Sequence, residues 1–199
     1  MNRLIVAAAV AAAFVVSPLA AQTPAPPPPP AYGVGIGFDA AKKALAAAEA
    51  EAKKNNWPVA IAIVDSSAKL VAFSKMDGTQ HASVDIAIGK AVTANNFKRP
   101  TKALQDGIAQ GGVNLRILGQ SGVTPLEGGV PIVVDGKIVG AIGASGVMSN
   151  QDAEVAMAGR RGSSGEVTAR SGRLQGDRRP ASAAAQDPPA MIDRVRFST

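Results

Sequence analysis

The sequence predicts an α+β domain in which a mainly antiparallel sheet is flanked by helices. Two regions, residues 57–76 and 131–146, each contain a pair of apolar runs joined by a short turn, the pattern of a β-hairpin. Apolar residues recur with helical spacing in the segments before, between and after these hairpins. Hairpins that alternate with helices favour helices packed on an antiparallel sheet over a doubly wound parallel sheet.

The first half of this domain is expected to run helix, hairpin, helix. FDAAKKALAAAEAEAKK starts near Asp39, the predicted N-cap, carries an alanine-rich face and ends at Asn55 and Asn56. WPVAIAIVD is an almost continuous apolar run, typical of a strand buried on both faces, and SSAK turns into a second strand, LVAFSKM. From Ser83 the helical spacing of apolar residues predicts a second helix, based on Val84, Ala87, Ile88 and Ala91.

The second half is expected to contain a short helix, a glycine-rich loop, a hairpin and a last helix. RPTKALQDGI places Pro100 near the first turn of a helix, where its missing N–H costs nothing. GGVNLRILGQSGVTPLEGGVP indicates a loop around one short strand. PIVVDGKIVGAIGASG is the clearest hairpin signal, because Asp135-Gly136 is a type I′ turn dipeptide. The last helix is expected from about Asn150.

Both ends of the chain differ in composition from this domain, which we predict to span residues 37–159. Residues 1–21 have one positive charge at Arg3, an apolar run and then small residues, the pattern of a secretory signal peptide. This predicts a periplasmic or secreted protein, and an uncleaved N-terminal anchor is the alternative. Residues 22–36 contain five consecutive prolines and are expected to form an extended linker.

Residues 160–199 are predicted to form a disordered, arginine-rich tail. They contain eight Arg and no Lys, whereas residues 32–159 contain ten Lys and two Arg, and they lack apolar periodicity. The abrupt change suggests a shifted reading frame in the source gene. A coding sequence that resumes an apolar helix in another frame after Gly159 would support that hypothesis, and one that does not would end it.

The composition excludes several classes of site. The chain has no cysteine, so disulfides, cysteine-ligated zinc, iron–sulfur clusters and c-type haem attachment are excluded. It has a single histidine, His81, so one chain cannot form a two-histidine metal site. The net charge of +6 does not predict nucleic-acid binding, because residues 32–159 hold 12 Lys and Arg against 11 Asp and Glu.

Four segments in register resemble the GlcG/HbpS family, whose members are often labelled haem-binding or haem-degrading. They are WPVAIAIVDSSAKLVAFSKMDG, ASVDIAIGKAVTANNFKRPTKAL, GGVPIVVDGKIVGAIGASG and QDAEVAMAG, and the similarity covers about residues 38–159. The resemblance implies a mainly antiparallel sheet of about five strands flanked by helices. It also implies a homo-oligomer, an octamer by resemblance, that binds haem or a related tetrapyrrole. An exported member assists a membrane sensor kinase, which implies a possible sensor partner. The chain departs from the family pattern at Arg160.

Candidate residues for holding a tetrapyrrole follow from the chemistry that an iron porphyrin needs. His81, which comes just before a predicted helix, and Met76 are candidate axial donors, along with Met148, Tyr32 and Thr79, and His81 is the candidate metal ligand. The alternative is that His81 is an ordinary exposed loop residue. Lys98 and Arg99, with Lys102, could pair with propionates, although a solvated helix start explains them equally well.

Four acidic residues follow apolar runs or lie in predicted loops, where metal binding or proton transfer would place them: Asp65, Asp77, Glu127 and Asp152. Asp65 and Asp77 are expected to cap turns. Glu127 is a candidate binding residue, because neighbouring glycines would let a ligand approach the backbone N–H groups closely. The alternative is that these glycines serve only the turns. No catalytic residue is assigned.

Three functions are consistent with these patterns. The leading hypothesis is an exported haem- or tetrapyrrole-binding protein with a protective or sensory role. The alternatives are a structural or accessory homo-oligomer that binds another protein, and an enzyme of haem breakdown or of small organic acid metabolism. A conventional serine hydrolase is disfavoured, because no G-x-S-x-G segment accompanies the single histidine.

Overall fold

The computed structural model describes residues 27–176, with side chains described as far as Ser163. The signal peptide predicted for residues 1–21 and the last part of the predicted tail lie outside this range. In chain order the elements are β1 (Ala31–Tyr32), α1 (Phe38–Lys54), β2 (Ala60–Asp65), β3 (Leu70–Lys75), α2 (Ser83–Asn96), α3 (Lys102–Gln110), the 3-10 helix η1 (Gly112–Gly119), β4 (Gly129–Val134), β5 (Lys137–Ser145) and α4 (Ser149–Gly176).

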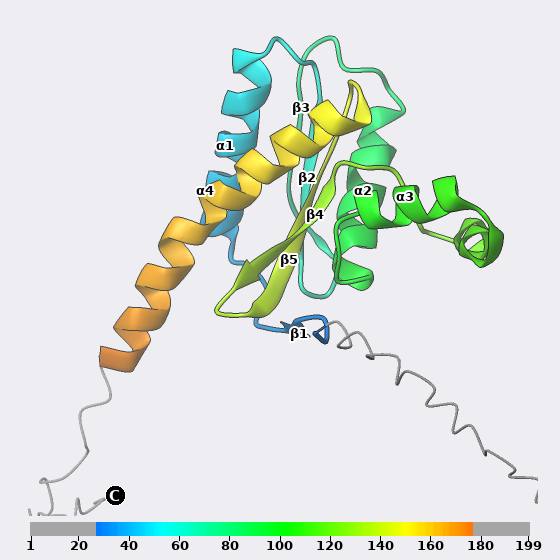
Figure 1. Ribbon diagram of the computed structural model, residues 1–199. Helices are drawn as coiled ribbons and strands as arrows, with labels where there is room; N and C mark the ends of the chain where they lie inside the picture. The colour runs from blue at the N-terminus through cyan, green and yellow to red at the C-terminus, as the bar shows by residue number, and fades with distance from the viewer. Residues whose placement is uncertain (1–26, 177–199) are drawn as a thin grey trace, which may run out of the picture.

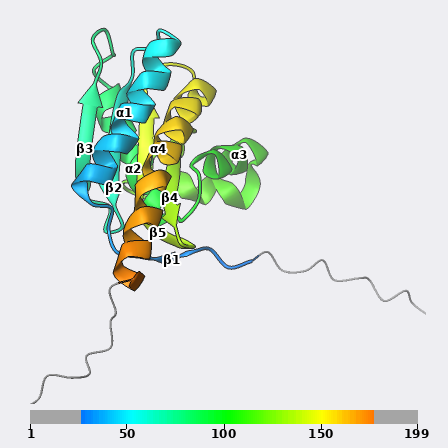
Figure 2. The same ribbon diagram turned by 90° about the vertical axis from the view of Figure 1, so that its left-hand side faces the viewer.

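The predicted α+β fold with a mainly antiparallel sheet is confirmed. The long strand β5 pairs antiparallel with both β2 and β4, and β3 pairs antiparallel with the other side of β2. The only parallel pair among the described strands joins β1 to the start of β5. Figures 1 and 2 show α1 and α4 on one face of this sheet and α2 on the other.

Strand β2 shows why the sheet needs helices on both faces. Its odd-numbered apolar residues, such as Ile61 and Ile63, pack in the cluster that contains the buried residues of α1 and α4. Its even-numbered residues, such as Ala62 and Val64, pack with the apolar face of α2. Successive side chains of a strand point to opposite faces, so a strand buried on both sides must be apolar throughout. The prediction from WPVAIAIVD is confirmed.

Two short elements differ from the prediction. The strand expected within the glycine-rich loop does not form, and η1 occupies part of that segment instead. The fifth strand is β1, which lies inside the predicted linker. There the N–H groups of Gly33 and Ile36 donate to the carbonyl groups of Ile138 and Val139, at 2.8 Å and 2.7 Å, and Ile36 is buried. The chain therefore joins the sheet before Gly37.

The two ends of the helical layer also correct the sequence interpretation. The N-cap of α1 is Gly37, whose residue type allows no side-chain cap, and Asp39 lies in the first turn, where its charge favours the helix dipole. Helix α4 runs to Gly176, past residue 160, where the disordered tail was predicted to begin. Near that point Gly162 lies against Ala47 of α1, and Ser163 is buried.

Candidate functional site

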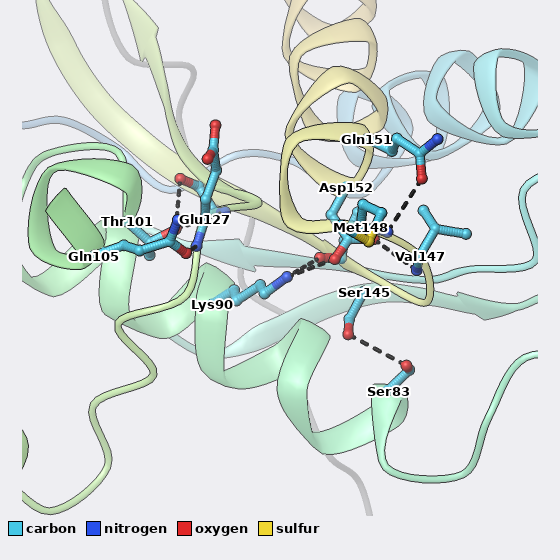
Figure 3. Close-up of polar contacts among 12 residues, drawn as sticks. Ser83, Lys90, Thr101, Gln105, Glu127, Ser145, Val147, Met148, Gln151 and Asp152 are labelled. Atoms are coloured by element: carbon cyan, nitrogen blue, oxygen red, sulfur yellow. Dashed lines mark hydrogen bonds and ion pairs between the residues drawn. The ribbon is translucent and has the colours of Figure 1, made fainter. Parts of the chain in front are cut away.

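Within residues 27–163, the most deeply buried charged groups are a lysine and an aspartate that sequence analysis did not pair. Lys90 of α2 and Asp152 of α4 are exposed by only 1% and 2%. The ammonium group of Lys90 donates to Oδ2 of Asp152 at 2.7 Å and to the carbonyl oxygen of Ala144 at 3.0 Å, and the N–H of Val147 donates to Oδ1 of Asp152 at 3.2 Å. Figure 3 shows Lys90 and Asp152 pointing toward each other.

This pair connects the two helical layers at the end of the sheet. Ala144 belongs to β5, so the lysine joins α2, β5 and α4 at one point. Burial raises the pKa of Asp152 above its usual range, against the opposing effect of the hydrogen bonds from Lys90 and Val147. Gly128 passes directly over the pair, and a side chain there would meet the ammonium group at 2.8 Å. The absence of a side chain at Gly128 therefore lets the loop pass close to the buried pair.

The glycine-rich loop lies against the start of α3. The N–H of Gly129 donates to the hydroxyl of Thr101 at 2.9 Å, and the N–H of Glu127 donates to Oε1 of Gln105 at 2.8 Å (Figure 3). Gly128 has a φ of 126°, a conformation that side chains rarely adopt. These contacts hold the glycine-rich loop against the start of α3.

Glu127 and Lys102 lie close together in this region. Their charged groups are 3.8 Å apart, and the ammonium group of Lys102 also contacts Asp106 at 2.9 Å. The hydrogen bond with Asp106 raises the pKa of Lys102, and Glu127 adds to this effect. Lys102 therefore faces two carboxylates of its own chain, which leaves it less suited to a ligand carboxylate than the sequence suggested.

Met76 lines an open cavity between the second half of α1 and the end of β3. The cavity has a volume of about 360 Å³, and its other lining residues are polar: Glu49, Lys53, Ser74, Lys75 and Asp77. The ammonium group of Lys53 lies 3.6 Å from Glu49. Lys75 has no ion-pair partner among the described residues. The cavity thus combines a half-buried thioether with a free cation.

His81 does not line this cavity. It lies exposed in the turn before α2, and its carbonyl oxygen accepts a hydrogen bond from the N–H of Val84 at 3.2 Å. The side chain of Thr79, two residues earlier, is buried, and its hydroxyl has no hydrogen-bond partner. His81 is therefore open to solvent and to any ligand that reaches the start of α2.

Lys98 and Arg99 lie beyond the other end of α2. The ammonium group of Lys98 lies 4.4 Å from the centre of the Tyr32 ring, and the Tyr32 hydroxyl donates to the carbonyl oxygen of Asn95 at 2.9 Å. Nε of Arg99 donates to the carbonyl oxygen of Phe97 at 3.1 Å. Because α2 has 14 residues, its ends are about 21 Å apart. One chain therefore does not bring His81 together with these cations, and the predicted set, which also includes Met76 and Glu127, divides among four places.

The remaining candidates are explained by local structure. Oδ1 of Asp65 accepts hydrogen bonds from the N–H groups of Ser67 and Lys69 at 2.8 Å and 2.9 Å, which is the turn-capping role expected of it. Met148 is exposed. Within residues 27–163, no group of three or more His, Asp or Glu side chains is placed to hold a metal ion. In that same part of the chain, no helix is long and apolar enough to cross a membrane.

A family model described as "Haem degrading protein HbpS-like" matches residues 36–161. The chain belongs to the HbpS-like family. It is 42% identical to Protein GlcG of Escherichia coli K12 over 94 residues, which are 47% of this chain and 69% of that protein. It is 34% identical over 99 residues to an uncharacterised 15.0 kDa protein of Citrobacter freundii, covering 49% of this chain and 70% of that protein.

Two solved structures share the fold. A double mutant of Streptomyces reticuli HbpS is 31% identical, with a TM-score of 0.60 over 69% of this chain and 97% of that chain. A complex of PduOC with haem is 27% identical, with a TM-score of 0.60 over 65% of this chain and 95% of that chain. The family resemblance predicted from the sequence is confirmed.

Lys90 is the residue that the sequence analysis missed. It lies three residues after Ala87 and four before Ala94, on the buried face of α2, and it is not part of the apolar set that predicted this helix. A lysine on a buried helix face needs a partner for its charge. The sequence alone does not identify that partner, because Asp152 is 62 residues away.

Proposed function

We propose that this protein binds haem or a related tetrapyrrole. The observation that carries the proposal is the similarity of almost the whole of PduOC, in its haem complex, to this chain at 27% identity. The family description, which names haem degradation, agrees with it. Both observations concern relatives. In this chain, haem binding would depend on side chains that can ligate the iron and pair with the propionates.

The cavity of Met76 offers a thioether and two ammonium groups. Its other lining residues are polar and two of them are acidic, so the apolar walls for a porphyrin ring would have to come from outside this cavity. The iron accepts a thioether as an axial donor, and the propionates need cations. Met76 would supply the thioether, and Lys75 is the cation on the cavity wall that no described carboxylate occupies. Lys53 would supply a second ammonium group once it leaves Glu49. When bound, haem would add redox chemistry that the side chains of this chain lack.

A hemin titration of the purified protein tests the proposal. A saturable shift of the Soret band at micromolar hemin is expected, and no shift would refute haem binding. Met76→Ala should change the bound spectrum if the thioether ligates the iron. His81→Ala is the matched comparison, because His81 is the other candidate donor and lies outside the cavity. A change only in His81→Ala would assign the axial bond to the imidazole instead.

The family description gives a specific reason to test haem breakdown as a second function. Bound hemin would be supplied with a reductant, and loss of absorbance would be followed together with release of iron. Both must occur for turnover. Loss of hemin with peroxide alone would not count, because peroxide destroys hemin without an enzyme.

We also propose that the protein acts outside the cytoplasm, in a protective role or as an accessory to a membrane sensor. The support is the signal-like pattern of residues 1–21, with its charge at Arg3 and its apolar run. N-terminal sequencing of protein recovered from the periplasm or the medium tests this. A protein that retains Met1 and fractionates with the cytoplasm would contradict it.

A further inference from the structure

The segment YGVGIGF, residues 32–38, alternates apolar residues with glycine where the chain enters the domain. Of its four apolar side chains, only Ile36 is buried. The exposed fractions of the others are 42% for Tyr32, 89% for Val34 and 60% for Phe38. Single exposed apolar residues are common on protein surfaces, but three within one short segment form a patch that indicates an interaction.

Close contacts hold this segment across one end of the domain. A Cβ atom at Gly33 would lie 3.0 Å from the Cβ of Lys137, at the start of β5. A Cβ atom at Gly35 would lie 3.2 Å from the Cβ of Asp65, at the end of β2. Glycine therefore lets the backbone lie directly on these strands, and Val34 between the two glycines is left exposed to solvent. Figure 1 shows β1 at the same end of the domain as the turn between β4 and β5.

Two neighbouring turns extend the apolar patch. Leu70, the first residue of β3, follows the turn that begins at Asp65, and it is exposed. Val133, two residues before the Asp135-Gly136 turn, is exposed as well. We call this end of the domain, with its exposed apolar residues, the linker end, because residues 27–30 of the predicted linker lead directly into β1.

The charged residues around these apolar side chains are mostly basic. Two ammonium groups lie over the two aromatic rings, that of Lys98 at 4.4 Å from the centre of Tyr32 and that of Lys42 at 4.8 Å from the centre of Phe38. The five basic residues of the linker end are Lys42, Lys69, Lys98, Arg99 and Lys137, and the three acidic ones are Asp39, Asp65 and Asp135.

Two of these three acidic residues already have partners. Asp39 lies 3.1 Å from the ammonium group of Lys42, and Asp65 accepts hydrogen bonds from two backbone N–H groups of its own turn. The linker end therefore presents a net positive charge around an exposed apolar centre.

We propose that the linker end docks on an anionic phospholipid surface. Interfacial membrane binding combines apolar side chains that enter the boundary of the acyl chains with aromatic rings at headgroup level. Lys and Arg near the surface add attraction to anionic headgroups. Val34 and Phe38 would enter the boundary, Tyr32 would lie at headgroup level, and the surrounding cations would face the phosphates. The proposal rests on exposure and charge, so it does not depend on haem binding.

Vesicle flotation tests this docking with the chain from residue 22 onward. Residues 1–21 are left out because an apolar leader would itself bind lipid, and every described contact lies beyond them. The vesicles contain either phosphatidylcholine alone or phosphatidylcholine mixed equally with phosphatidylglycerol. We expect binding to the mixed vesicles at low salt. Binding should weaken as salt rises, because the Debye length falls from about 30 Å at about 0.01 M to about 3 Å at about 1 M.

Two matched valine variants separate the linker end from the rest of the surface. Val34→Asp places a charge in the apolar patch, and Val113→Asp places the same charge on η1, at a valine that is 71% exposed. Val34→Asp should weaken binding to the mixed vesicles by about tenfold or more, because it removes an apolar side chain from the lipid boundary. Val113→Asp should bind like the unmodified protein, and the circular dichroism of both variants should stay unchanged.

A second pair of variants tests the charge. Lys69→Gln combined with Lys137→Gln should weaken binding several-fold and reduce its dependence on salt, because each lysine adds attraction to the anionic surface. Lys54→Gln, at the other end of α1, is the control and should have no effect.

Three results would overturn the proposal: no binding to the mixed vesicles at low salt, a Val34→Asp variant that binds as tightly as Val113→Asp, or binding to pure phosphatidylcholine that salt does not weaken. If Val34→Asp lowers the mass in light scattering while vesicle binding persists, the patch is a contact between protein chains and the proposal is wrong. Hydrogen exchange on the unmodified protein keeps the test decisive if Val34→Asp does not fold. The amides of residues 31–38 should exchange more slowly with mixed vesicles, and equal exchange with and without them would refute docking.

Discussion

Separating the buried charges of Lys90 and Asp152 should destabilise the fold strongly. Asp152→Asn removes the negative charge but keeps the shape of the side chain, so it leaves the ammonium group of Lys90 buried with the carbonyl of Ala144 as its remaining strong acceptor. Removing one partner of a buried pair typically costs about 3–5 kcal/mol, because the other charge stays out of water without compensation. For a domain of this size, the expected fall in Tm is roughly 6–20 °C.

The reciprocal variant should cost less than Asp152→Asn. Lys90→Met leaves a carboxyl group that still accepts from the N–H of Val147 and can take up a proton, since burial has already raised its pKa. We expect its cost at the lower end of about 3–5 kcal/mol. The double variant should cost about 1–3 kcal/mol less than the two single variants added together, because it leaves no charge unpaired.

Urea denaturation followed by circular dichroism gives the free energies of unfolding for this cycle. The matched control is Asp106→Asn, which removes the carboxylate from an exposed pair, Lys102 and Asp106, whose charged atoms are 2.9 Å apart. Its effect should be within the error of the measurement, because water screens exposed pairs. Strict additivity of the two buried variants, or an Asp152→Asn variant as stable as the control, would refute the coupling.

Two further predictions concern the pH dependence and the packing of the core. The carboxyl group of Asp152 should titrate in NMR above its ordinary pKa of 3.8, because burial raises it. The carboxyl group therefore binds its proton more tightly in the folded state than in the unfolded chain. Its contribution to stability is greatest below pH 3.8 and declines as the pH rises through the elevated pKa. A titration midpoint at or below 3.8 would contradict this. Gly143→Ala should cost about 1–3 kcal/mol in urea denaturation, because the new methyl group would meet the carbonyl oxygen of Ala87 on α2. Gly119→Ala, where nothing lies within 4 Å of the new carbon, should be nearly neutral, and an equal cost for both would show that packing is not the cause.

The elements with a strong local pattern could be predicted from the sequence. The apolar run of β2 and the Asp135-Gly136 turn between β4 and β5 specify their own conformations, and the structure has both. Strand β1 could not be predicted, because two residues give no periodicity and their pairing depends on β5, more than 100 residues away. The N-cap of α1 was placed two residues late, because an acidic residue in the first turn resembles a capping residue.

The candidate site was less predictable than the fold. Residue type identified Met76 and His81 as possible donors, but only the folded chain shows that one lines a cavity and the other is exposed. Lys98 was predicted as a cation for a ligand, and in the structure it lies over the ring of Tyr32. Which of these residues bind a ligand stays a prediction. Sequence spacing alone did not show that His81 and Lys98 lie at opposite ends of α2.

The small side chains of the core have a consequence for stability. Glycine and alanine let helices approach the sheet closely, as where Gly143 lies directly beneath Ala87 of α2, but each alanine removes little apolar surface from water. The described domain therefore gains less from its core than a leucine-rich domain of equal length would. If the chain assembles as the family resemblance implies, assembly would add to this stability and the Tm should rise with protein concentration. A Tm that is independent of concentration would show that one chain is sufficiently stable alone.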